Sequence, residues 1–176
     1  MQPTHHLQLI EVLKERFGEK PIVGIETGTY CGDSATQILN NTNCTKLYTI
    51  DPWLHGEGKE FEAGEPQPYH DKNMSFALRR MEQFGDRVEI MRMTSEAAYH
   101  ELLLRDPEFK VNFVWIDGDH SKEGVTTDIA FENIILPGGL IGGHDYGQCH
   151  PLTEIILEKY GNLINAGGDF TWWVHL

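Results

Sequence analysis

The chain has 176 residues, which suits a single domain, and 40% of them are hydrophobic, enough for a folded core. Fourteen Lys and Arg residues against 27 Asp and Glu residues give a formal net charge of −13, which disfavours nucleic acid as a partner because duplex binding needs a basic face. Apolar runs fall short of the ~20 residues of a membrane span, and three cysteines without a CxxC pair disfavour a disulfide framework. We therefore expect one cytoplasmic domain over residues 1–176, without a nucleic-acid or membrane partner.

Short apolar runs alternate with stretches of helical periodicity along most of the chain. We expect strands at 21–25, 46–50, 87–91, 111–116 and 139–142, and helices at about 5–17, 33–41, 70–84, 95–105, 122–135 and 151–160. The first of these helices belongs to an N-terminal segment, residues 1–20. A repeating strand–helix order with apolar strands predicts a parallel sheet that is covered by helices on both faces.

Two segments depart from this alternation. Near the C-terminus, the strand-like runs 162–165 and 170–176 are joined by a Gly-rich link, which predicts a hairpin with an antiparallel last strand. The segment 54–69 follows the second strand and is rich in Gly, Glu and Pro. A long loop at the carboxyl end of a strand is a usual place for ligand contacts, so this segment is predicted to be a substrate or lid loop.

The carboxyl ends of the predicted strands carry acids that a sheet core does not need. Four of the five strands end near one: Glu26, Asp51, Asp117 and Asp145. Gly28, in the turn after the first strand, allows the backbone to approach a ligand closely. Because ligands bind at the carboxyl edge of open α/β sheets, these residues predict a binding site there.

Asp51 and Trp53 follow the second strand, where nucleotide-binding sheets hold a ribose. An acid at this position suits the two ribose hydroxyls, and an indole could stack on a base. Gly28 and Gly32 have the spacing GxxxG instead of GxGxxG, which weakens a nicotinamide interpretation. The alternative is that Glu26 and Asp51 only cap the local backbone.

Four segments, in the same order along the chain, carry a resemblance to a known family. They are GIETGTYCGDSA (24–35), TIDPW (49–53), FVWIDGDHSKEGVTTDI (113–129) and LPGGLIGGHDY (136–146). Together they resemble the motifs of class I S-adenosylmethionine (SAM)-dependent methyltransferases, in particular the macrocin and catechol O-methyltransferase-like group known as methyltransferase domain 24. The resemblance implies a Rossmann-like α/β fold: a mostly parallel seven-stranded sheet with an antiparallel last strand and helices on both faces.

The resemblance implies SAM as the cofactor. Tyr30 and Ser34 would surround its methionine part, Asp51 would hold the ribose, and Trp53 and Ser95 would lie at the adenine. The residues that the resemblance assigns to SAM share positions at or just after the ends of the first four strands; they are Glu26, Thr27, Gly28, Thr29, Tyr30, Ser34, Asp51, Trp53, Ser95 and Asp117.

The resemblance also implies a catalytic half of the site. It matches Asp117, His144 and Asp145 to the ligands of Mg²⁺ or another divalent metal, and His120 to a general base that acts together with Asp117. Relatives usually have an acid where this chain has His144, and imidazole suits Zn²⁺, Mn²⁺ or Fe²⁺ better than Mg²⁺. A different metal, a His144 that is not a ligand, and a site without metal therefore all stay open.

These features predict a SAM-dependent O-methyltransferase that acts on a hydroxyl of a small sugar- or phenol-like molecule. A cation would lower the pKa of this hydroxyl, and a nearby histidine would accept the proton. Two alternatives remain: a non-catalytic SAM-binding domain, and a metal-dependent phosphoester hydrolase, which the GDH (118–120) and GHD (143–145) triplets superficially resemble. A homo-oligomer in which a second copy completes the pocket is also left open.

Overall fold

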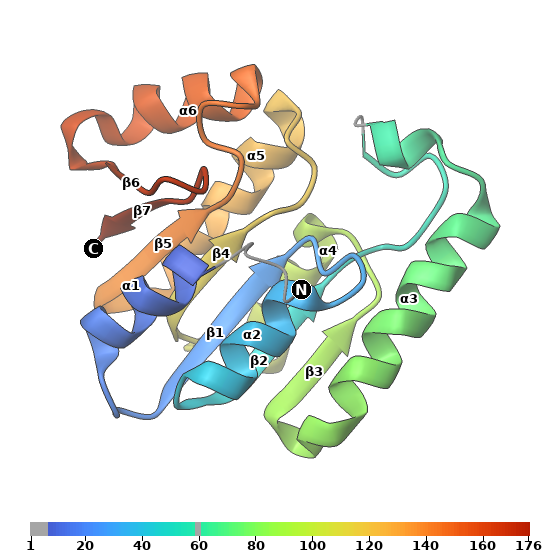
Figure 1. Ribbon diagram of the computed structural model, residues 1–176, viewed down its shortest axis with the longest axis horizontal. Coiled ribbons are helices and arrows are strands. Elements are labelled where there is room, and N and C mark those ends of the chain that lie inside the picture. The colour runs from blue at the N-terminus through green and yellow to red at the C-terminus, as the bar shows by residue number, and fades with distance from the viewer. Residues whose placement is uncertain (1–6, 59–60) are drawn as a thin grey trace.

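One seven-stranded sheet organises the molecule (Figure 1). The structure is a computed structural model, and it describes residues 7–58 and 61–176. The strands are β1 (Ile22–Thr27), β2 (Cys44–Ile50), β3 (Val88–Met91), β4 (Val111–Ile116), β5 (Ile135–Gly143), β6 (Asn165–Ala166) and β7 (Trp172–His175). They lie in the order β3-β2-β1-β4-β5-β7-β6, in which β1 to β5 are parallel and β7 is antiparallel to both of its neighbours. This arrangement confirms the predicted Rossmann-like fold.

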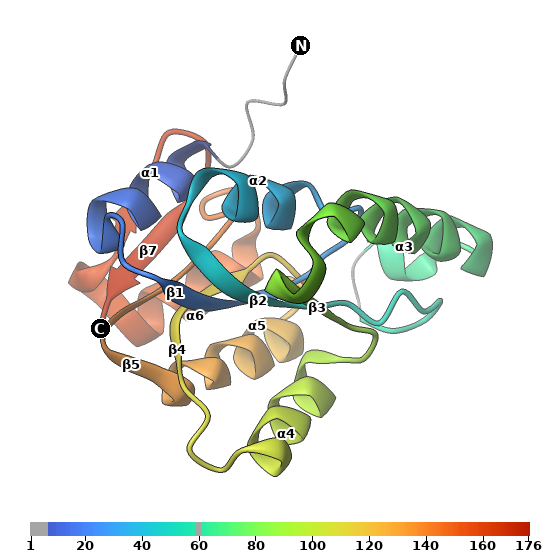
Figure 2. The ribbon, with the colours of Figure 1, turned by 90° about the horizontal axis from the view of Figure 1, so that it is seen from below.

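Helices cover both faces of the sheet, as Figure 2 shows. They are α1 (Leu7–Phe17), α2 (Asp33–Asn41), α3 (Gln67–Met81), α4 (Ser95–Arg105), α5 (Lys122–Ile129) and α6 (His150–Tyr160). One hydrophobic core joins α1, α2 and α3 to the sheet, and a second core joins α4, α5 and α6 to its other face. The middle strands β1 and β4 are buried over most of their length, which explains why apolar residues dominate their sequences.

Local capping sets the helices that begin next to the strand ends. The side chain of Thr94 accepts a hydrogen bond from the amide of Ala97 at the start of α4, and the side chain of Ser121 accepts one from the amide of Gly124 at the start of α5. Both caps satisfy amides that the helix itself leaves unbonded. They fix where the chain turns after β3 and β4, and therefore which residues face the edge of the sheet.

The structure corrects several predicted boundaries. Helix α3 begins at Gln67, inside the predicted 54–69 loop, because Pro68 is tolerated in a first helical turn, and residues 61–64 form a short 3₁₀ helix. The predicted helices 70–84 and 122–135 end as α-helices at Met81 and Ile129 and continue as 3₁₀ turns. In the C-terminal hairpin, residues 161–163 form another 3₁₀ turn, so β6 keeps only two residues.

Some expectations fall on residues outside the described part. Residues 1–6, where the first helix was expected to begin, and residues 59–60 of the predicted loop lie outside it. Within the described part, no helix combines the length and the apolarity that crossing a bilayer requires.

Candidate active site

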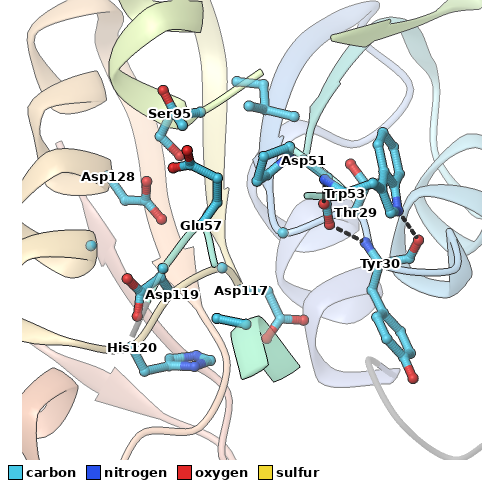
Figure 3. A pocket seen from close by; sticks show the side chains of 18 of the residues that line it. Thr29, Tyr30, Asp51, Trp53, Glu57, Ser95, Asp117, Asp119, His120 and Asp128 are labelled. Carbon is cyan, nitrogen blue, oxygen red and sulfur yellow. Dashed lines mark hydrogen bonds between the residues drawn. The ribbon is translucent and has the colours of Figure 1, made fainter. Parts of the chain in front are cut away.

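A cleft of about 930 Å³ opens at the carboxyl ends of β1, β2, β4 and β5 (Figure 3). It extends from Asp51 after β2 to Asp145 after β5, and the segment from Leu54 to Gly58 forms part of its wall. Its volume lies within the range typical of pockets for small ligands. The predicted binding edge of the sheet is therefore a cavity in the folded chain.

Gly28 allows the end of β1 to lie directly against the end of β4. Its φ is +83°, and a Cβ atom built at this position would lie 1.9 Å from the backbone oxygen of Asp117. Only glycine combines this left-handed backbone with this close approach. The turn after β1 is consequently held close to the β4 end, and both turns line the cleft.

Asp51 organises the part of the cleft that lies beside β1 and β2. Its two carboxylate oxygens accept hydrogen bonds from the backbone amides of Tyr30 and Trp53, each at 2.8 Å. Tyr30 and Trp53 both have positive φ, a conformation that is costly for bulky residues unless the surroundings hold it. Burial raises the pKa of Asp51 above its ordinary value, while the two amides act in the opposite direction.

Trp53 is largely buried beneath this part of the cleft. Only 2% of its surface is exposed, and its indole Nε1 donates a hydrogen bond to the backbone oxygen of Tyr30 at 2.8 Å. The Tyr30 ring is exposed, and its hydroxyl is hydrogen-bonded to that of Tyr69 in α3 at 2.7 Å. Stacking of Trp53 on an adenine stays a prediction; the contacts present show that the indole supports the Tyr30 loop.

Glu26 and Thr27, both predicted to contact the cofactor, do not line the cleft. They lie in the last two positions of β1, where both faces are buried. Ser34 donates a hydrogen bond to Glu26, and burial raises the pKa of Glu26 to about 8. The remaining predicted SAM residues do line the cleft; they are Gly28, Thr29, Tyr30, Ser34, Asp51, Trp53, Ser95 and Asp117.

Asp128 is a buried residue of the site that the sequence analysis missed. Its carboxylate accepts hydrogen bonds from the side chains of Thr27, at 2.7 Å, and Ser95, and burial raises its pKa to about 6. These contacts tie together the end of β1, the start of α4 and the middle of α5. An acid on the buried face of α5, between Val125 and Ile129, was the signal that could have revealed it.

The other part of the cleft brings Asp117, His120 and Asp145 together. One ligand atom from each lies within 4.8 Å of the others, so in the described part of the chain these three residues form a group that could hold a metal ion. His120 is buried, and its Nε2 lies 3.5 Å from Oδ2 of Asp145. That separation is an ion-pair distance, too long for a good hydrogen bond.

His144, predicted as the third metal ligand, has a different position. It belongs neither to this group nor to the residues that line the cleft in the described part of the chain. Its Nδ1 lies 3.1 Å from Oδ1 of Asp145, and the hydrogen bond between them raises the pKa of His144. Asp145 itself adopts a left-handed conformation, with a φ of 61°. This turn sets its carboxylate between the two imidazoles.

A family model described as a methyltransferase domain (Methyltransf_24) matches residues 25–146. The chain belongs to this methyltransferase family. The match covers the strand ends that form the cleft, and SAM is the cofactor of the family.

The chain also resembles a protein of Acanthamoeba polyphaga mimivirus that has no assigned function. The two are 25% identical over 143 residues, which are 80% of this chain and 59% of the viral protein. The chain thus spans about three-fifths of the length of this curated relative.

Solved structures share the fold of the chain. The calicheamicin methyltransferase CalS11 matches with a TM-score of 0.72 at 9% identity, over 99% of this chain and 80% of its own. An O-methyltransferase from Bacillus cereus in complex with SAH matches with a TM-score of 0.61 at 16% identity, over 100% of this chain and 82% of its own. An rRNA methylase from Streptococcus thermophilus matches with a TM-score of 0.61 at 12% identity, over 99% of this chain and 95% of its own. At these identities the likeness shows the fold alone, and relatives with different substrates share it.

One residue of the cleft wall has an unused polar atom that a bound cofactor such as SAM could contact. The side-chain oxygen of Thr29 is buried in the cleft wall and has no hydrogen-bond partner among the described residues. Buried hydroxyls are rarely left in this way, so this oxygen is suited to a polar ligand atom. Because Gly28 has no Cβ, the turn that carries Thr29 can lie directly against the backbone of Asp117 and Gly118.

Proposed function

We propose that this methyltransferase transfers the methyl group of SAM to a hydroxyl of a small molecule, sugar- or phenol-like, with His120 as the general base. The observation that carries the proposal is the position of His120. Its buried imidazole lines the same cleft as the Asp51-held loops and lies beside the carboxylate of Asp145. One cavity then contains both a base and the loops that Asp51 holds at Tyr30 and Trp53, which we call the cofactor cradle.

The cofactor would occupy the part of the cleft beside β1 and β2. SAM supplies an electrophilic methyl group when it is bound there. Asp51 keeps the Tyr30 and Trp53 backbones in their left-handed conformations, and Thr29 offers a buried hydroxyl. Since these groups are arranged before binding, little ordering cost remains for the cofactor.

His120 would accept the proton of the acceptor hydroxyl at Nε2. The carboxylate of Asp145, 3.5 Å away, would stabilise the imidazolium that forms. His144 holds the other oxygen of Asp145 and so keeps this carboxylate oriented toward His120. An alcohol is a weak nucleophile until it loses its proton, and general base catalysis contributes ~10²–10⁴-fold to such steps.

A divalent cation would be held by Asp117, His120 and Asp145, where it would lower the pKa of a hydroxyl and orient it. Two carboxylates and one imidazole suit Mn²⁺, Zn²⁺ or Fe²⁺ better than Mg²⁺. The metal and base roles of His120 exclude each other at the same nitrogen, because a coordinated nitrogen has no lone pair for a proton. Metal dependence therefore decides which role His120 has.

Calorimetric titration with S-adenosylhomocysteine (SAH), with and without Mg²⁺ or Mn²⁺, tests the proposal first. We expect one-to-one binding in the micromolar range, followed by transfer of a labelled methyl group from SAM to members of a panel of sugars and phenols. Absence of SAH binding under every metal condition would rule out the proposal. SAH binding without transfer to any acceptor would favour the non-catalytic alternative.

A further inference from the structure

A buried carboxamide on α3 lacks a hydrogen-bond partner. Asn73 is 7% exposed, and its Nδ2 atom forms no hydrogen bond with any described residue. Asn73 also belongs to the residues that line the cleft. A buried N–H group without an acceptor costs free energy in the folded chain, and such groups are rare in native structures. The Asn73 amide is therefore suited to a polar molecule that binds in the cleft.

Asn73 lies on the face of α3 that packs against the turn after β1. Tyr69 is one helical turn before it and Ala77 one turn after it, so the three side chains share one face of the helix. The Tyr69 hydroxyl is hydrogen-bonded to that of Tyr30 at 2.7 Å. A Cβ built on Gly32 would lie 3.2 Å from Cα of Ala77. Asn73 thus lies between two points at which α3 meets this turn.

Thr29 provides a second unpaired group in the wall of the same cleft. It belongs to the turn after β1 and is 2% exposed, and its side-chain oxygen has no hydrogen-bond partner among the described residues. Thr29 and Asn73 come from separate elements of the fold. A local packing defect would explain one unpaired atom, whereas two such atoms on one cavity wall indicate a common polar ligand.

We infer that Asn73 is a further cofactor-binding residue, which donates a hydrogen bond from Nδ2 to an acceptor atom of SAM. The inference rests on the proposed function, because it adds a contact at the same cofactor site. SAM has acceptor atoms in its methionine carboxylate and in its nucleoside, and an amide nitrogen only donates. The amide gains a partner when the cofactor binds. Asn73 should therefore contribute to cofactor affinity and not to the stability of the ligand-free protein.

Asn73→Leu separates these two quantities, because leucine has a similar volume and no polar atom. In calorimetry, SAH should bind about tenfold more weakly, which corresponds to the loss of about one hydrogen bond. The urea midpoint of the ligand-free variant should equal or exceed that of the wild type, because an unpaired buried group is removed and leucine favours a helix more than asparagine does. The control Asn41→Leu makes the same substitution at an exposed position of α2 and should leave the SAH affinity unchanged.

A second variant and a second ligand sharpen the test. Asn73→Ala removes the same amide without adding bulk, so it should weaken SAH binding by the same factor even where leucine does not fit. The ligand 5′-methylthioadenosine keeps the nucleoside and lacks the amino acid part of SAH. An equal loss of affinity for both ligands would assign the amide to the nucleoside, and a loss for SAH alone would assign it to the carboxylate.

The outcomes separate this inference from the proposed function. If the wild type and both Asn73 variants bind SAH with equal affinity, the inference is overturned and the proposed cofactor stands. If both variants lose SAH affinity and urea stability together, the carboxamide supports the folded chain, and the inference is overturned as well. Absence of SAH binding by the wild type would overturn the proposed function and, with it, the cofactor contact of Asn73.

Discussion

The two halves of the cleft are built by different physical means. Beside β1 and β2, the backbone does the shaping: Asp51 accepts two amides, and Gly28 brings two strand ends together. Beside β4 and β5, ionisable side chains face one another: one ligand atom each of Asp117, His120 and Asp145 lies within 4.8 Å of the other two. The comparison teaches that one sheet edge can hold both a rigid cradle and a reactive charge cluster. Changes in the two halves should therefore affect different measured quantities.

The largest expected effect separates chemistry from binding. His120→Ala should lower the turnover of methyl transfer by ~10²–10⁴-fold while the SAH affinity stays nearly constant, because the base is lost and the cradle is not. Turnover and calorimetric SAH binding of the same preparation provide the measurement. His150→Ala, at the exposed start of α6, is the matched control. A parallel loss of SAH affinity would mean that the two halves are not independent.

Gly28→Ala tests how closely the cradle is built. The added Cβ would lie 1.9 Å from the Asp117 backbone oxygen, so we expect a loss of unfolding free energy of about 4 kcal/mol and weakened SAH binding. Gly18→Ala is the control, because Gly18 also has a positive φ but no neighbour within 4 Å, and it should cost only about 1 kcal/mol. Similar losses in urea denaturation of the two variants would contradict the close approach.

Glu26→Gln tests the buried carboxyl behind the cradle through the pH dependence of stability. Burial raises the pKa of Glu26 from 4.5 to about 8, so in this window the unfolded chain releases a proton that the folded chain keeps. Glu26 should consequently contribute on the order of 4 kcal/mol to a fall in the unfolding free energy of the wild type as the pH rises through the window, and Glu26→Gln should remove this contribution, leaving the smaller fall that Asp128 causes. Denaturation curves at about pH 5 and pH 8 measure it.

The control for this experiment is Glu158→Gln, an exposed residue of α6. It should keep the full pH dependence of the wild type. If the fall in Glu26→Gln is as large as in the wild type, then the folded chain does not hold Glu26 in its neutral form.

Asp51→Ala should weaken SAH binding by the cradle, and this is the smallest of the expected effects. Two amides lose their acceptor and two left-handed residues lose their support, so we expect SAH to bind about tenfold to a hundredfold more weakly. Asp86→Ala, an exposed residue, is the control. Calorimetry that finds an unchanged SAH affinity for Asp51→Ala would refute the assignment of Asp51 to the cofactor.

The fold could be predicted where its signals are local. Three elements lie at their predicted positions: helices 33–41 and 95–105 and strand 111–116. Hydrophobic periodicity and caps such as Thr94 depend only on residues that are near in the sequence, so they can be recognised without the fold. The acids at the strand ends could be assigned to one edge, since parallel strands end together. Boundaries failed where α-helices pass into 3₁₀ turns, which share the same periodicity over a few residues.

The sequence by itself determined the sheet, its covering helices and the edge at which the polar residues gather. Only the tertiary structure decided which of these residues meet. Thr27 and Asp128 are 101 positions apart, and His120, instead of His144, lies in the group with Asp117 and Asp145. Such contacts depend on strand register and on single turns, and a one-residue change in either redirects a side chain without altering the periodicity from which the fold was predicted.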